Sequence, residues 1–296
     1  MKNKILGEAY KEISNDNKLI RLATLTTIFH SLILVLYILF QTHFVITNLS
    51  HTNINIDLQM YWKLLFGHSG VTIIFIIIGL ILIIGYFFLP PIAEGALIHY
   101  VASKNKSGTS SLGKGFMKFF PLFEFHGLIS LFNFLVFFVA ISRLYVIGIL
   151  FNVFVLSIVI IRLLFIVGVG LLLPYAQFFI VIHNKGVYES IKESISMAVE
   201  NFRLTFKFFL ISYFLYLRFL INIILIIGLP LILMYIAIKL GLEDNATYLI
   251  YGVLGIMIII TAYINGIIEA FFISFWYKVF SYIEGNLEIK EDENAK

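Results

Sequence analysis

The chain has 296 residues, of which 60% are hydrophobic and 13% are charged, and its mean hydropathy is +0.99. A soluble domain carries about 25% charged residues, and it cannot hide so much apolar surface from water. The composition therefore indicates an integral membrane protein and excludes a cytosolic enzyme, a secreted disulfide scaffold and a disordered tail. The net charge is +4, and the absence of cysteine removes disulfides and thiolate metal sites from consideration.

The first 21 residues are polar, and the apolar run after them lacks the small-residue cleavage site of a signal peptide. Ile5, Ala9, Ile13 and Leu19 fall on one side of a helix. This pattern predicts a short amphipathic helix that lies on the cytoplasmic surface of the membrane. The alternative is a partly ordered polar tail. In both cases residues 1–21 form a cytoplasmic segment that is separate from the membrane domain.

Six apolar runs follow, and each is long enough to cross a bilayer, since a crossing helix needs about 20 apolar residues. Lipid offers no hydrogen-bond partner to open strand edges, so we expect helices. The runs predict an all-α fold, with one six-helix membrane domain over residues 22–283 and a cytoplasmic acidic tail over residues 284–296. The approximate spans are residues 22–46, 70–102, 119–142, 145–182, 206–240 and 248–282.

Lysine and arginine predict the orientation of the helices, because cytoplasmic loops carry an excess of these residues. Of the 21 lysines and arginines, three lie in the loops on one side and two lie inside spans. The remaining 16 lie in segments 1–21, 103–118, 183–207 and 278–296. This distribution places both termini in the cytoplasm, in agreement with an even number of crossings, and we expect the protein in the plasma or inner membrane.

The fourth run is too long for one plain crossing. Residues 145–182 would form a helix of about 57 Å, whereas the hydrocarbon core is about 30 Å thick. We therefore expect the second, fourth and sixth helices to continue past the inner leaflet as cytoplasmic extensions. Pro90–Pro91 and Pro174 predict kinks or breaks in the second and fourth helices.

A short pattern recurs near the cytoplasmic ends of the three inward-running helices. It reads Pro91-Ile-Ala-Glu94, Pro174-Tyr-Ala-Gln177 and Gly266-Ile-Ile-Glu269. The copies are about one helical hairpin apart, which predicts three hairpins of the same orientation, related by an axis along the membrane normal. Coincidence is the alternative, because four-residue patterns recur easily in apolar sequence.

The two long cytoplasmic connectors are predicted to contain amphipathic helices that lie in the inner interface. In the second connector, Gly186 is expected to let the chain turn. The apolar stripe that follows it consists of Val187, Ile191, Ile195 and Ala198. In the first connector, Thr109 or Ser110 is expected to cap a helix.

These motifs carry a family resemblance. Glu94-Gly-Ala at a helix end, a serine-containing turn, and Asn184-Lys-Gly-Val followed by Glu189-Ser-Ile and Asn201-Phe-Arg are the residues concerned. They resemble the six-helix membrane domain attached to some bacterial glycerophosphoryl diester phosphodiesterases, and related stand-alone membrane proteins that include YciC-like proteins. The resemblance covers residues 89–211 by motif and the rest by topology. It implies a fold and an envelope role but no reaction, since the soluble phosphodiesterase domain is missing.

Charged side chains inside a bilayer are costly, so they are the candidates for a functional site. Helix direction places Arg162 and Arg218 near the middle of the membrane. Four further candidates lie toward the inner half, namely Glu94, Glu124, Gln177 and Glu269. The arginines either pair with the carboxylates or bind a lipid phosphate or another anion, or else they snorkel or form one structural pair. The glutamates either join such a site or sit close enough to the interface to reach water.

His126 and Glu124 raise the question of a proton relay or a metal site. Residues at i and i+2 do not share a helix face, and no second ligand follows at helical spacing. The sequence therefore predicts no metal site, and it indicates no cofactor.

The sequence contains no phosphate-binding glycine loop, nucleotide fingerprint or nucleophile elbow. Its basic residues follow membrane sidedness, so nucleic-acid binding is not indicated. We expect a non-enzymatic protein that organises envelope lipid or assists other proteins, with the bilayer, an anionic lipid or a partner membrane protein as its contacts. The alternative is a transporter or channel for a small solute or lipid. An intramembrane lipid enzyme is a third reading, for which the polar candidates are dispersed.

Overall fold

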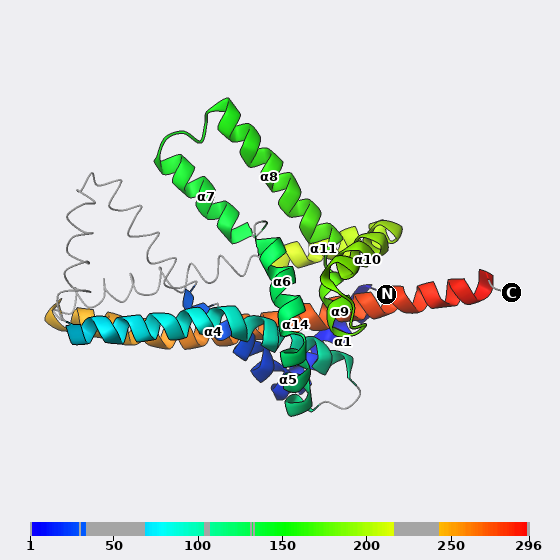
Figure 1. Ribbon diagram of the computed structural model, residues 1–296, viewed down its shortest axis with the longest axis horizontal. Helices are drawn as coiled ribbons and strands as arrows, with labels where there is room; N and C mark the ends of the chain where they lie inside the picture. The colour runs from blue at the N-terminus through cyan, green and yellow to red at the C-terminus, as the bar shows by residue number, and fades with distance from the viewer. Residues whose placement is uncertain are drawn as a thin grey trace.

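The protein is all-helical in the part that its structure, a computed structural model, describes (Figure 1). The described residues are 2–29, 31–33, 69–103, 107–130, 132, 134–215 and 243–294. The helices are α1 (Lys2–Asn15), α4 (Ser69–Ala102), α5 (Gly108–Met117), α6 (Phe119–Ser130), α7 (Phe134–Val146), α8 (Val153–Leu172), α9 (Ala176–Val181), α10 (Val187–Glu200), α11 (Phe202–Leu215) and α14 (Glu243–Asn294). Residues 17–29 and 31–33 are also helical. The all-α prediction is confirmed for these residues.

Three of the described helices are long and apolar enough to cross a membrane, which supports a membrane location. They are Ile76–Ala102 within α4, Val153–Leu172, which is α8, and Ile258–Gly285 within α14. The predicted spans 22–46 and 206–240 lie outside the described residues beyond positions 33 and 215 respectively. The structure therefore supports three of the predicted crossings rather than six.

The predicted spans 119–142 and 145–182 are wrong in their boundaries. The third run is divided between α6, which ends at Ser130, and α7, which begins at Phe134. The end of α7 belongs to the predicted fourth span, and α8 begins only at Val153. A turn at Gly148, with φ of 80°, reverses the chain between α7 and α8. Glycine adopts this left-handed conformation without steric cost, so the reversal occurs several residues later than hydropathy indicated.

Pro174 interrupts the fourth run, as predicted. α8 ends at Leu172 and α9 starts at Ala176, which leaves backbone groups at the break without helical partners. The Ser194 hydroxyl of α10 donates to the Leu172 carbonyl oxygen at 2.9 Å and accepts from the Tyr175 N–H at 3.2 Å. One serine thus satisfies both sides of the break and ties α10 to it.

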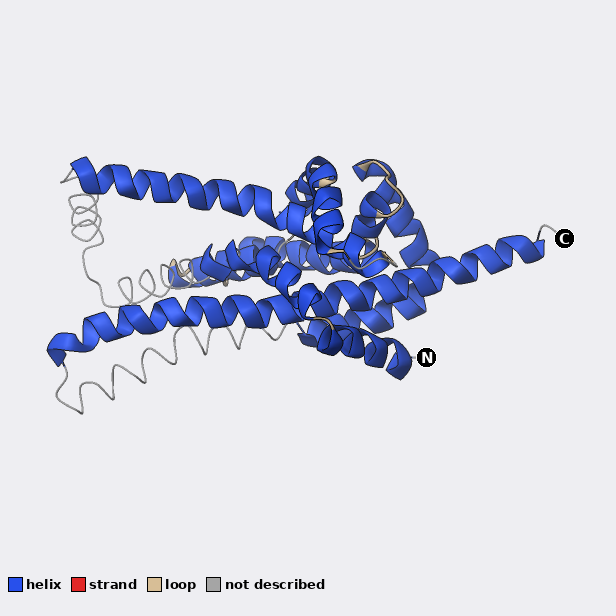
Figure 2. Cartoon of the chain, turned by 90° about the horizontal axis from the view of Figure 1, so that it is seen from below, coloured by secondary structure: helices blue, strands red, loops and turns tan. Residues whose placement is uncertain are grey.

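α4 and α14 are the two longest helices described. α4 stays helical through Pro90 and Pro91, so no break occurs at this pair. α14 continues to Asn294, and therefore includes residues 284–294 of the predicted tail. The two helices overlie each other in Figure 1, but Figure 2 shows their outer ends apart and their inner parts close together.

The packed core lies where the C-terminal part of α4 meets α9, α14 and the N-terminal helices. Its largest fully buried side chains include Tyr100, Tyr175, Phe178, Phe275 and Phe280. The helices outside this core have few buried residues. In the segments that are apolar enough to cross a membrane, 22% of the window in α4 and 6% of the window in α8 is buried. We call this packed region the base, and we call α8 and the outer part of α4 the arms. In Figure 1 the α7–α8 hairpin points away from α4 and α14.

The apolar stripe of α1 packs on protein. Ile5, Ala9, Ile13 and Leu19 are buried in the base, and α1 contacts α14. The sequence identified this stripe correctly, but its members pack on protein, whereas the prediction had them face the membrane. α14 contacts α1 and binds its Glu12 through Ser274 and Lys278, which lie within the predicted sixth span.

α10 also packs on protein, against α6, α8, α9 and α11. Val187 and Ala198 of the predicted stripe are buried, but Ile195 is exposed. The buried face is completed by Ser190, Ser194 and Met197. The predicted stripe is thus rotated, because the Ser194 hydroxyl, which binds both sides of the break in the fourth run, takes a buried position that hydropathy does not assign to it.

Two predictions of turn chemistry are also wrong. Asn184, with φ of 57°, makes the turn before α10, while Gly186 has φ of −67° and precedes the helix as its N-cap. Asparagine tolerates the left-handed conformation because its short side chain can hydrogen-bond locally. In the first connector the N-cap position is Ser107, and Thr109 and Ser110 lie inside α5.

Candidate functional site

α4 and α5 cross in direct backbone contact. A Cβ atom on Gly115 would lie 2.1 Å from the Ile92 carbonyl oxygen and 2.8 Å from the Ala96 nitrogen. A Cβ atom on Gly95 would lie 2.9 Å from Cδ1 of Leu122, which belongs to α6. Only glycine permits such close approach of two helices. The crossing therefore sets the start of α6 directly beside α4.

This arrangement brings a carboxylate and an imidazole together. Oε2 of Glu94, which is buried on α4, lies 2.5 Å from Nε2 of His126 on α6. The charge of Glu269 on α14 adds a weaker, longer-range effect on the same imidazole. We call these three residues the polar trio. The structure thus pairs one predicted candidate, Glu94, directly with a histidine, and the charge of a second candidate, Glu269, acts on the same histidine.

The polar trio can hold and exchange a proton, because imidazole and carboxylate are the side chains best suited to proton transfer near neutral pH. No group of three histidine, cysteine, aspartate or glutamate side chains forms a candidate metal site in the part of the chain that the structure describes. The chemistry that this geometry offers is proton exchange.

Sequence reasoning considered His126 beside Glu124, whereas the structure pairs His126 with Glu94. Glu124 is exposed on α6, as expected for a residue two positions away on a helix. A signal for the correct partner was present in the sequence. Gly95 and Ala96 follow Glu94, and small residues mark a place where another helix can approach closely.

The remaining candidates lie elsewhere. Arg162 on α8 is half-buried, and its guanidinium lies 6.0 Å from the ring centroid of Phe137 on α7, within the range of a cation–π contact. It is positioned by the α7–α8 pair, a different pair from the one that holds Glu94 and His126. Gln177 is half-buried in α9. Arg218 lies outside the described residues.

A second polar cluster ties the N-terminal helices to the base, and sequence reasoning missed it. Oε2 of Glu12 accepts a hydrogen bond from the Ser274 hydroxyl at 2.8 Å and lies 3.1 Å from Nζ of Lys278 on α14. The Asp16 carboxylate accepts from the Tyr100 hydroxyl of α4, at 2.9 and 3.1 Å to its two oxygens. The polar face of α1 therefore binds protein too, which a reading of the N-terminus as a separate segment could not show.

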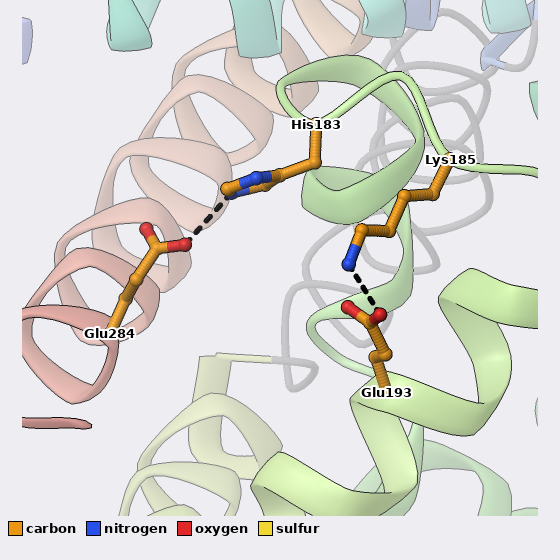
Figure 3. Close-up of polar contacts among 4 residues, drawn as sticks. All are labelled: His183, Lys185, Glu193 and Glu284. Carbon is orange, nitrogen blue, oxygen red and sulfur yellow. Dashed lines mark hydrogen bonds and ion pairs between the residues drawn. The ribbon is translucent and has the colours of Figure 1, made fainter. Parts of the chain in front are cut away.

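A third set of contacts holds the turn between α9 and α10. Figure 3 shows His183 reaching from the end of α9 to Glu284 on α14, with 2.8 Å between Nε2 and Oε1. In the same view Lys185 forms an ion pair with Glu193 of α10. These two pairs hold the turn that contains Asn184 against α14 and α10, so we interpret them as structural contacts.

Comparison with protein-family models, with curated proteins and with solved structures found no match in any of the three.

Proposed function

We propose that this protein is a non-enzymatic membrane protein that organises envelope lipid or assists partner membrane proteins. The observation that carries the proposal is the exposure of α8, of whose crossing window 6% is buried, beside a base with fully buried aromatic side chains. An apolar helix with so little protein around it needs lipid or another membrane protein to cover it. The base supplies a fixed support for this arm.

The proposal includes the finer topology, namely six crossings in three parallel hairpins with both termini in the cytoplasm. The distribution of basic residues supports it, and so does the resemblance of its motifs to the six-helix membrane domain of the phosphodiesterases. Topology reporters fused after Lys106, Asn245 and Lys296 test it. We expect cytoplasmic signals at Lys106 and Lys296 and an outer signal at Asn245. An outer signal at Lys106 would overturn the orientation.

The absence of native cysteine allows a direct test of the exposed arm. A nitroxide on Leu164→Cys of α8, an exposed position, is expected to be accessible to oxygen dissolved in the bilayer of liposomes. The matched control is Ile166→Cys, which lies two residues away and is buried. Equal accessibility at the two positions would contradict the proposed lipid-covered arm.

The same liposomes test whether the protein has a transport activity. A non-enzymatic organiser is expected to give no solute or lipid flux above that of protein-free vesicles. Flux that is present in the wild type and lost in Arg162→Ala would contradict the proposal and assign transport instead.

A second candidate function, proton-coupled transport, is favoured by the polar trio alone. Titratable groups contributed by several helices are the means by which transporters move protons. Vesicles with an imposed pH gradient test this candidate. Proton uptake that is lost in Glu94→Gln and kept in the exposed control Glu124→Gln would support it, and uptake equal to that of protein-free vesicles would remove it.

A further inference from the structure

One face of α11 packs against the rest of the protein, and another face is exposed. Thr205, Phe208 and Ser212 are buried, and the Thr205 hydroxyl lies 2.9 Å from that of Tyr175. The side chains exposed on the first turns of the same helix are Phe202, Arg203, Phe206 and Lys207. The exposed face therefore combines two aromatic and two basic side chains, and protein packing accounts for neither pair.

The two basic residues of this face stand four positions apart, and like charges at that spacing repel on a helix. No ion pair in the described part of the chain involves Arg203 or Lys207. The nearby Glu200 carboxylate accepts a hydrogen bond from Ser196 at 2.6 Å. Phe202 and Phe206 stack beside the charges, with ring centroids 5.8 Å apart. A basic pair next to an apolar pair is complementary to an anion that also carries an apolar part.

The first connector ends in the same arrangement. Lys114 and Lys118 are four residues apart at the end of α5, and burial, followed by the charge of Lys114, lowers the pKa of Lys118. Neither lysine forms an ion pair within the described residues. The large apolar side chains exposed around them are Phe116, Met117 and Phe120. Two connectors of different sequence thus present a basic pair beside exposed apolar side chains.

Both basic pairs lie at the start of a long apolar run of the sequence. From Phe208 to Ile238 the one charged residue is Arg218, and the third apolar run begins directly after Lys118. Basic residues at such a boundary lie at the level of lipid headgroups. In the orientation proposed above, both pairs lie at the inner leaflet, where anionic lipids attract basic clusters.

We infer that Lys114–Lys118 and Arg203–Lys207 are two binding sites for the phosphate headgroups of anionic phospholipids, with the neighbouring exposed apolar side chains against the acyl chains. Charge complementarity selects the anionic headgroup, and the adjoining phenylalanines select a lipid over a free phosphate ion. The inference rests on the proposed function and deepens it by naming the lipid class.

Native mass spectrometry of the full chain in neutral detergent, stripped of lipid and titrated with phosphatidylglycerol, tests the inference. Each basic residue near anionic lipid contributes roughly fivefold to binding, so loss of a pair weakens it about 25-fold. We expect this loss in Arg203→Ala/Lys207→Ala and, at the other site, in Lys114→Ala/Lys118→Ala. The matched control, Lys11→Ala/Lys192→Ala, removes two exposed charges that form no such pair and should keep the wild-type affinity.

Three results would overturn the inference: equal weakening in the control variant, equal affinity for phosphatidylcholine, or displacement of phosphatidylglycerol by millimolar inorganic phosphate. Removing like-charge repulsion should leave the unfolding midpoint in lipid-free detergent unchanged or higher. If an alanine variant fails to fold, Arg203→Gln/Lys207→Gln, which keeps the side-chain bulk, must show the same loss. The nitroxide test on α8 does not involve these residues, so failure of the headgroup sites and failure of the lipid-covered arm give separate results.

Discussion

Gly115 of α5 faces the backbone carbonyl of Ile92 in α4 so closely that an added Cβ atom would lie 2.1 Å from the oxygen. This contact sets the α4–α5 crossing and, through it, the position of α6.

Gly115→Ala is therefore expected to lower the free energy of unfolding by roughly 1–3 kcal/mol, because backbone must move to admit a methyl group. The measurement is the unfolding midpoint of the purified protein in detergent. Gly113→Ala in the same helix is the control. A Cβ there meets no atom within 4 Å, so the variant should gain about 0.5–1 kcal/mol from helix propensity. Effects of the same sign in both variants would contradict the close crossing.

Glu94 is expected to stabilise the fold through His126. Glu94→Ala leaves the half-buried imidazole without its carboxylate partner, which costs about 1–3 kcal/mol. Thermal unfolding in detergent measures the loss. Glu124→Ala removes the same charge from an exposed position of α6 and should change the midpoint little. If the two variants behave alike, the 2.5 Å contact does not contribute to stability.

Glu12 and Lys278 are expected to be energetically coupled across the junction of α1 and α14. A double-mutant cycle of Glu12→Ala and Lys278→Ala should give a coupling free energy of roughly 0.5–3 kcal/mol, since both side chains are largely shielded from water. Lys11→Ala in place of Lys278→Ala is the comparison, because Lys11 is exposed. Additive effects in the first cycle would show that this ion pair does not help to hold α1 against α14.

Asn184 is expected to matter more than Gly186 for the turn before α10. Asn184→Val forces a β-branched residue to φ of 57° and should cost about 1–2 kcal/mol, whereas Asn184→Gly should be neutral or stabilising. Gly186→Ala should be tolerated, because its φ is −67° and a Cβ there meets no atom within 4 Å. Denaturant unfolding gives the free energy of unfolding of the three variants. A larger loss of stability in Gly186→Ala than in Asn184→Val would contradict the observed backbone conformation.

Hydropathy predicted helices and some of their ends, because apolar length is a property of the local sequence. The span 70–102 agrees closely with α4, and Pro174 ends a helix as expected. Hydropathy could not predict the separation of α6 from α7, nor the turn at Gly148, since these segments are equally apolar on both sides of the reversal. Such a reversal depends on what the two helices pack against.

The candidate site could be predicted only in part, because some of it depends on tertiary contacts. Glu94 and Glu269 stand out in the sequence as carboxylates in apolar runs, and the structure relates both to one imidazole. The pairing of His126 with Glu94 depends on the crossing of α4 with α5, which is a tertiary contact. The cluster of Glu12, Ser274 and Lys278 joins residues more than 260 positions apart, and no local pattern carries that information.

α14 is one unbroken helix of 52 residues, about 78 Å long at 1.5 Å per residue. That length is more than twice the hydrocarbon thickness of a bilayer. When a change in bilayer thickness alters the tilt of such a helix, residues along it that bind α1, such as Ser274 and Lys278, would move with it. We therefore expect the geometry of the base to depend on the thickness of the surrounding lipid.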